Sequence, residues 1–401
     1  MRHEPLPAVA LKRKPALWLL VLITFSGTLA MHMFVPALPI AAQDLGASIS
    51  AMQMTISLYI LGLAFGQLIY GPLSDCFGRK PILMVGLALY TAAGIAAAVA
   101  PGVYALIAAR LFQALGGCAG LVLGRAMVRD MSGPEAAARQ LAVMSLVVVI
   151  GPALAPLFGG LLASTFGWRS IFLLLIALGA SNLLFAWRFL PETGQPSGTI
   201  SVLSLGRDYK GLLCSRAFLG YTIGGGFATT SGYAFIAASP FIFEEFGRPA
   251  HEVGIALGLL AVGAFIGSAL ASRLIGRVRM ESLMVGANAV STLSALVFLS
   301  LVLLGMIDVF SAVGLMILFT MGSGLSSPAA LTKAVSVNPR MIGSAAGLYG
   351  FAQMAVGAIC TSLSGVGHDP ALAAACILAA AGIISQAAFA IALRSEGATG
   401  A

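Results

Sequence analysis

Two side chains that can carry a positive charge lie inside long apolar stretches of this sequence. Arg110 falls in the apolar run 103–124, and His32 falls in the run 16–37. A charge at the centre of a bilayer costs at least about 2.5 kcal/mol, so such a residue should face the protein interior or an aqueous cavity. We expect Arg110, with Gln113 three residues later on the same helical face, to act in substrate or proton handling. The alternative is a structural arginine that binds backbone carbonyls of a neighbouring helix.

Three roles are open for His32. Imidazole has an ordinary pKa of about 6.5, so His32 could take up and release a proton near neutral pH, as a coupling residue does. It could also hydrogen-bond a substrate, or it could be a satisfied histidine in helix packing. The sequence alone does not choose among these roles.

Carboxylates are absent from the middle of the apolar runs, because all 14 Asp and Glu residues fall in loops or at the ends of runs. A permanently cationic ligand would find no counter-charge there, so we expect a neutral or anionic substrate. Small-molecule pockets combine an apolar lining with a few polar groups. With His32, Arg110 and Gln113, the candidates for the substrate or proton pathway are Tyr59, Tyr233, Tyr349 and Gln353.

The other chemistry-bearing residues do not indicate an enzyme. His3, His251 and His368 lie outside the runs, and no Cys/His cluster has metal-ligand spacing, so we expect no metal and no cofactor. The sequence contains no GxxxxGK[ST] loop for ATP and no Ser/His/Asp set for hydrolysis. Active transport would therefore have to draw on an ion or solute gradient.

The elements that carry these residues are apolar runs of membrane-spanning length. Of the 401 residues, 59% are hydrophobic and 9% are charged, whereas a soluble domain carries roughly 25% charged residues. Runs of about 20 apolar residues span a bilayer as helices. We predict an all-α membrane protein with twelve spans, at 16–37, 51–72, 81–100, 103–124, 141–163, 167–190, 217–240, 252–275, 282–304, 308–330, 341–364 and 371–393.

The positive charges predict the orientation of these spans. Lys and Arg are retained in short loops on the cytoplasmic side. All of them except Arg110, Arg169 and Arg248 fall on the side that holds both termini. We therefore predict cytoplasmic termini. This topology explains the net charge of +8 without a nucleic-acid partner.

One long polar connection, at 191–216, divides the spans into six and six. GPLSDCFGRK at 71–80 also has a degraded counterpart, ALASRLIGRV, at 269–278, as expected for a duplicated transporter. We predict an N-terminal six-helix bundle over 1–190, a cytoplasmic central loop over 191–216 and a C-terminal six-helix bundle over 217–401.

Several motifs resemble signatures of one transporter family. GPLSDCFGRK resembles its loop between the second and third helices, RLFQALGG at 110–117 its fourth helix, and the Gly-Pro to Gly-Gly stretch at 151–160 its antiporter helix. These three motifs make the chain resemble the major facilitator superfamily. RAMVRD at 125–130 and VPALP at 35–39 are narrower resemblances, by which the chain is similar to the Bcr/CflA-type drug-resistance transporters.

This resemblance implies two pseudo-symmetric bundles and proton:drug antiport by alternating access. It implies a small-molecule drug as cargo, protons as the coupling ion, and a monomer in the bacterial inner membrane. Related transporters carry an Asp just before the YLPALP-like stretch of the first helix, where this chain has His32 in MHMFVPALP. The alternative is an exporter or importer of a small metabolite, which could work without proton coupling.

The same resemblance assigns two groups of structural residues. One is a cytoplasmic latch in a tight loop, with Asp75 favouring a helix N-terminus and Arg79 pairing with Asp130; its residues are Gly71, Asp75, Gly78, Arg79, Arg129 and Asp130. The alternative for this loop is a solvated segment that only fixes topology. The other group is a close, kinked helix interface between the halves, formed by Gly151, Pro152, Pro156, Gly159 and Gly160.

Overall fold

The structure, a computed structural model, describes residues 16–194, 196, 202–338, 341–367 and 369–399. These residues are almost entirely helical, as expected where lipid offers the backbone no hydrogen-bond partner. The chain begins with α1 (Leu17–Phe34), η1 (Val35–Ala37), α2 (Leu38–Leu45), α3 (Ile49–Phe77), α4 (Arg79–Ala98), α5 (Val103–Met131), α6 (Pro134–Phe166) and α7 (Arg169–Phe189). It continues with α8 (Val202–Leu213), α9 (Arg216–Thr230), α10 (Tyr233–Glu245), α11 (Ala250–Leu274), α12 (Met280–Leu303), α13 (Val309–Ser336), α14 (Ile342–Ser364) and α15 (Pro370–Thr399).

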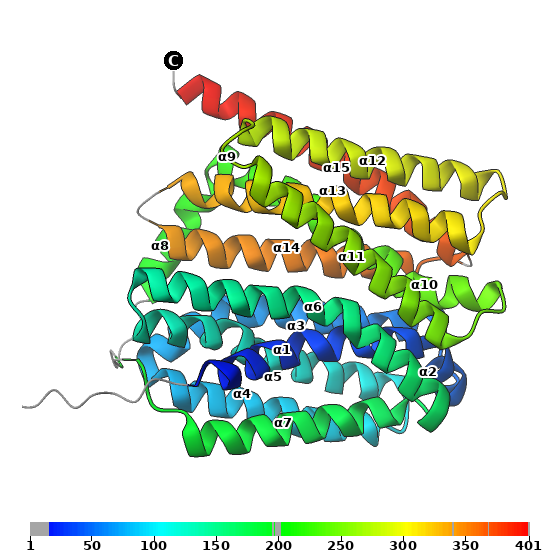
Figure 1. The fold of residues 1–401 in the computed structure, drawn as a ribbon, viewed down its shortest axis with the longest axis horizontal. Helices are drawn as coiled ribbons and strands as arrows, with labels where there is room; N and C mark the ends of the chain where they lie inside the picture. The colour runs from blue at the N-terminus through cyan, green and yellow to red at the C-terminus, as the bar shows by residue number, and fades with distance from the viewer. Residues whose placement is uncertain (1–15, 195, 197–201, 339–340, 368, 400–401) are drawn as a thin grey trace, which may run out of the picture.

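The helices form two groups that lie side by side (Figure 1). Helices α1 to α7 make up one group and α9 to α15 the other, while α8 lies at one end. The groups meet where α6 packs on α11, where α3 packs on α14, and where α10 contacts η1 and α2. We call the end that carries α8, the start of α1 and the end of α15 the proximal end. The opposite end, with α2 and the end of α10, is the distal end.

Within the part of the chain that the structure describes, ten helical segments are long and apolar enough to cross a membrane, counting Leu17–Leu45 as one. Helix α6 and the pair α9–α10 run between the same two ends (Figure 1), in the places of the fifth and seventh predicted spans. Large apolar side chains such as Tyr104 (81% exposed) and Phe310 (78%) point away from the protein. Lipid explains this exposure, which water would disfavour.

Two predicted spans are not single helices. The predicted span 217–240 is broken after Thr230, and α10 begins at Tyr233 beyond Ser231 and Gly232. Ser231 turns its hydroxyl back to the carbonyl of Phe227 at 2.6 Å, a bond that competes with regular helix. The first span likewise changes to a 3-10 turn around a proline before α2 continues it to the distal end.

Small residues bring the helices into close contact. A Cβ atom added to Gly27 of α1 would lie 2.7 Å from the carbonyl oxygen of Gly117 in α5, so a larger side chain does not fit at this crossing. In a membrane, association of helices depends on such packing rather than on exclusion of water. The crossing holds α1 tightly against α5, five residues before His32.

Candidate functional site

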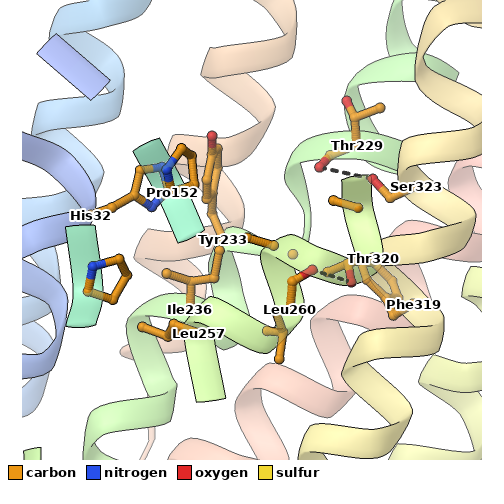
Figure 2. Close-up of a pocket in the computed structure, with 14 residues that line it drawn as sticks. His32, Pro152, Thr229, Tyr233, Ile236, Leu257, Leu260, Phe319, Thr320 and Ser323 are labelled. Carbon is orange, nitrogen blue, oxygen red and sulfur yellow. Dashed lines mark hydrogen bonds between the residues drawn. The ribbon is translucent and has the colours of Figure 1, made fainter. Parts of the chain in front are cut away.

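A cavity of about 250 Å³ lies at the junction of the two groups of helices (Figure 2). The first group contributes α1 and α6, and the second contributes α9, the α9–α10 break, α10, α11 and α13. The lining is mainly apolar, as is usual in small-molecule sites. It consists of His32, Pro152, Pro156, Thr229, Gly232, Tyr233, Ile236, Leu257, Leu260, Ala261, Ala264, Phe319, Thr320 and Ser323.

His32 and Tyr233 bring the two groups of helices together at this cavity. Their ring centroids are 6.2 Å apart and the rings are tilted by 45°, and Figure 2 shows the side chains next to each other. His32 is 5% exposed. Tyr233 reaches this place because the break after Thr230 makes it the first residue of α10. Among the described residues, neither side chain has a hydrogen-bond partner, so both are available to a ligand.

The other polar groups of the lining are occupied by the protein. Thr320 donates its hydroxyl to the carbonyl of Leu260 at 2.8 Å, and Ser323 donates to the carbonyl of Thr229 at 3.4 Å; both bonds are drawn in Figure 2. No Asp, Glu, Lys or Arg belongs to this lining. The cavity therefore offers a ligand an apolar wall with one imidazole and one phenol.

Gln353 and Tyr349 of α14 lie behind the lining. Gln353 donates from Nε2 to the hydroxyl of Thr229 at 2.6 Å, so it reaches the cavity only through that threonine. Tyr349 is buried against Gly225 of α9. Both candidates support the wall of the cavity, and neither is part of its lining.

Arg110, Gln113 and Tyr59 lie inside the first group of helices and outside the cavity lining. All three are fully buried. Arg110 donates from Nη1 to Gln113 Oε1 at 2.7 Å and from Nη2 to the carbonyl of Ala30 at 3.1 Å. Its guanidinium carbon lies 4.0 Å from the centre of the Tyr59 ring, and aromatic faces attract cations. Two further rings lie 5.4 and 5.8 Å away, those of Phe34 and Phe172.

Two tyrosines also donate hydrogen bonds to α1, the helix whose Ala30 carbonyl Arg110 binds. Tyr59 of α3 donates its hydroxyl to the carbonyl of Gly27 at 2.7 Å, and Tyr90 of α4 donates to that of Ser26 at 3.2 Å. Among the described residues, no carboxylate pairs with Arg110. These contacts favour the structural alternative for Arg110, in which it fixes the position of α1 and so of His32.

The latch motif is at the proximal end. Arg79 donates from Nε to Asp130 Oδ2 at 2.9 Å, the contact expected from the sequence, and pairs through Nη1 with Asp75 at 2.5 Å. The expected loop is different, however. Gly71 and Asp75 belong to α3, with Asp75 in its last turn and not at a helix N-terminus. The turn consists of Gly78 alone, whose φ of +98° favours glycine.

Glu192 is part of this site, and the sequence analysis missed it. Its carboxylate accepts hydrogen bonds from the backbone N–H groups of Arg79 at 2.9 Å and Lys80 at 3.0 Å. These are free donors at the start of α4, where a negative charge is favourable. Glu192 directly follows Pro191, beyond the end of α7, and nothing in its local sequence indicates a partner 112 residues away. Arg129, in contrast, is exposed and forms no salt bridge among the described residues.

The glycines of the predicted helix interface on α6 face two different helices. Gly151 and Gly159 face α1, where Gly159 packs directly on the carbonyl of Met33. Gly160 faces α11, and a Cβ atom there would lie 2.7 Å from the carbonyl oxygen of Ala250. Gly151 and Gly159 therefore pack within the first group of helices and not at the expected interface between the halves, whereas Gly160 does pack across to the second group. Between them, Pro152 and Pro156 line the cavity.

The family model for the Major Facilitator Superfamily matches residues 20–361. The chain belongs to this superfamily. Multidrug resistance protein D of Escherichia coli (strain K12) is 30% identical, over 87% of this chain and 88% of its own. The bicyclomycin resistance protein homolog of Haemophilus influenzae is 28% identical, over 83% of this chain and 84% of its own. These relatives confirm the resemblance to the Bcr/CflA-type branch of the superfamily.

Solved structures of superfamily transporters have the same fold. A bacterial homolog of the human lysosomal transporter Spinster, in an inward-facing and unoccupied conformation, aligns over 94% of both chains with a TM-score of 0.71 and 16% identity. The expected all-α fold of the superfamily is thus confirmed. The matches indicate a multi-pass membrane transporter rather than an enzyme.

Proposed function

We propose that this superfamily member exports small drug-like molecules, antibiotics included, in exchange for protons. The observation that carries the proposal is the cavity between the two groups of helices, with His32 and Tyr233 as its free polar groups. A binding site at the junction of two halves is the arrangement that alternating access requires. The names of the drug-resistance relatives support drugs as cargo.

The cavity favours a neutral or anionic cargo. A cation transferred out of water needs a counter-charge, and the lining has no carboxylate. A neutral compound needs only an apolar surface and a partner for its hydroxyl, carbonyl or amide groups. Tyr233 can donate or accept such a bond, and His32 can do either according to its tautomer.

His32 is the proposed proton carrier. It is the one histidine of the lining, and an imidazole can be neutral or protonated, which lets it take up and release a proton. A proton entering from outside would make the imidazole positive and take away its acceptor nitrogen. Cargo that binds this nitrogen would then leave, and loss of the proton to the cytoplasm would restore the site. Each charge that crosses the membrane contributes roughly 2.3 kcal/mol per 100 mV.

Alternating access would involve rocking of a bundle over 1–190 against a bundle over 217–401, joined by the central segment 191–216. Contacts at the distal end support a state closed there, for example the bond from Gln43 Nε2 to Glu244 Oε1 at 2.7 Å. The latch of Arg79, Asp75 and Asp130 would change as the bundles rock. The excess of Lys and Arg at the proximal end supports cytoplasmic termini, in the inner membrane of a bacterium. We propose that a single chain is the working unit.

The test is efflux from cells that express the protein. Neutral antibiotics such as bicyclomycin, together with anionic and cationic compounds, are loaded into cells with and without an uncoupler. Wild-type cells should export neutral or anionic compounds only while the proton gradient exists. His32→Ala and His32→Gln at matched expression should lose this export. If no compound moves, or if cations are the best cargo, the proposal is wrong.

A further inference from the structure

Gln53 joins the two groups of helices at the distal end. It lies in the second turn of α3 and is fully buried. Its Nε2 donates to the carbonyl of Ala237 in α10 at 3.3 Å. Its Oε1 lies 3.2 Å from the hydroxyl of Ser364, the last residue of α14, which can donate to it or to the carbonyl of Thr361 at 2.8 Å. One amide of the first group therefore binds two helices of the second.

The surroundings of this amide are shaped to admit it. Gly365 follows α14, and a Cβ atom there would lie 2.7 Å from Gln53 Oε1 and 3.1 Å from the Cα atom of Ser50. Only glycine leaves the room that the bond from Ser364 needs. The bond between Gln43 and Glu244 at the same end is exposed, so water can replace either partner. Gln53 is buried, and a buried polar group that loses its partner costs roughly 1–3 kcal/mol.

The helix that Gln53 holds is also a wall of the cavity. Ala237 lies one turn after Tyr233 and directly after Ile236, and both of these line the cavity. Pro240 deprives the carbonyl of Ile236 of its helical donor, and Ser239 Oγ donates to it at 3.0 Å instead. Helix α10 is therefore least regular where the cavity and Gln53 meet it.

We propose that Gln53 is the clasp of the distal gate, an amide that holds α10 and the end of α14 against α3 while this gate is closed. An amide suits this role because water entering an open gate can replace both of its protein partners, so closing and opening remain reversible. A leucine would gain from burial and oppose opening. The proposal rests on alternating access, but its test does not need cargo.

The test measures the distal gate directly. Spin labels are placed on cysteines at two exposed distal residues, Tyr104 in the first turn of α5 and Met306 between α12 and α13, after the five native cysteines are replaced by serine. Pulsed electron resonance in lipid nanodiscs then gives the distribution of distances. Gln53→Ala should move the closed-to-open ratio toward open by about tenfold, the effect of roughly one net hydrogen bond. Ser57→Ala is the matched control, because Ser57 is buried in the same helix but bonds only within it.

The variant Gln53→Glu tests whether hydrogen bonding by residue 53, rather than the packing of its side chain, keeps the distal gate closed. A protonated carboxyl can donate to the carbonyl of Ala237, but an ionised one cannot. This variant should close at low pH and open at high pH, reversibly. Glu244 and Glu245 of α10 and Asp369 after α14 are further carboxyl groups at this end, so the wild type is measured over the same pH series.

Two results overturn the clasp: a wild-type distance distribution in Gln53→Ala, or a pH response of Gln53→Glu equal to that of the wild type. Failure of the export proposal would give a different result. The spin-label distances of the Gln53 variants would still change as described, but no compound would be transported.

Discussion

His32 of α1 and Tyr233 of α10 face each other across the junction of the two halves, with ring centroids 6.2 Å apart. Each comes from a segment where a helix changes direction, just before η1 in one half and just after the α9–α10 break in the other. A ligand between them would contact both halves at once. Its binding can therefore bias the relative position of the halves, as alternating access requires.

Tyr233→Phe should weaken cargo binding without unfolding the protein. The change removes one hydroxyl, and one neutral hydrogen bond contributes about 0.5–1.5 kcal/mol. We expect the KM for export of a neutral cargo to rise about three- to tenfold. Tyr104→Phe, which changes an exposed tyrosine far from the cavity, serves as the control. An unchanged KM for Tyr233→Phe would mean that the phenol does not bind cargo.

Arg110→Lys should lower stability, because lysine keeps the charge but not the two directed bonds to Gln113 and Ala30. We expect a loss of about 2–3 kcal/mol and a lower Tm in detergent. Tyr59→Phe should cost only about 1 kcal/mol, since it keeps the ring beside Arg110 and loses the bond to Gly27. An Arg110→Lys protein with normal Tm and no export would instead assign Arg110 to proton or substrate handling.

Gly159→Ala should destabilise the protein far more than Gly71→Ala. A methyl group at 159 meets the carbonyl of Met33, whereas one at 71 meets nothing within 4 Å. Overpacking costs about 1–3 kcal/mol, and alanine in place of glycine inside a helix is otherwise favourable by up to about 1 kcal/mol. Thermal unfolding of the two purified variants compares them. Equal Tm values would contradict the close contact between α6 and α1.

Asp130→Asn should slow export while the protein stays folded. It removes the charge that binds Arg79 Nε at 2.9 Å and leaves Arg79 with Asp75. We expect the export rate to fall several-fold, in line with a partly exposed ion pair of about 1 kcal/mol. Arg129→Gln, at the neighbouring position, is the control because Arg129 is exposed and forms no salt bridge within the described residues. Equal rates in the two variants would favour a loop that only fixes topology.

The fold could be predicted from the sequence because lipid imposes simple rules. Long apolar runs must be helices, and the loop motif around Gly78 and Arg79 indicated the family. The break after Thr230 was not predicted, because the run 217–240 has no charged residue and no proline before Pro240, and its glycines, serines and threonines also occur in unbroken helices. The local sequence also did not reveal that Asp75 lies in the last turn of a helix and not in a loop.

The site was predicted only in part. His32 and Tyr233 stood out as polar groups in apolar runs, and both line the cavity. Arg110 stood out for the same reason, yet it lies in an aromatic cage inside one half. Periodicity shows that a side chain faces inward, but it does not distinguish the core of one bundle from the junction of two. Glu192 and Gln53 were missed because their partners are far away in the chain.

Proton release during cargo uptake is the most direct measurement of the proposed exchange. Inverted membrane vesicles that hold a respiratory pH gradient are given a neutral antibiotic, and a pH-sensitive dye reports protons leaving the lumen. We predict that cargo collapses part of the gradient in wild-type vesicles and has no effect in His32→Ala vesicles with equal protein. Cargo uptake with no proton release, or proton release of wild-type size in His32→Ala, would contradict coupling through His32.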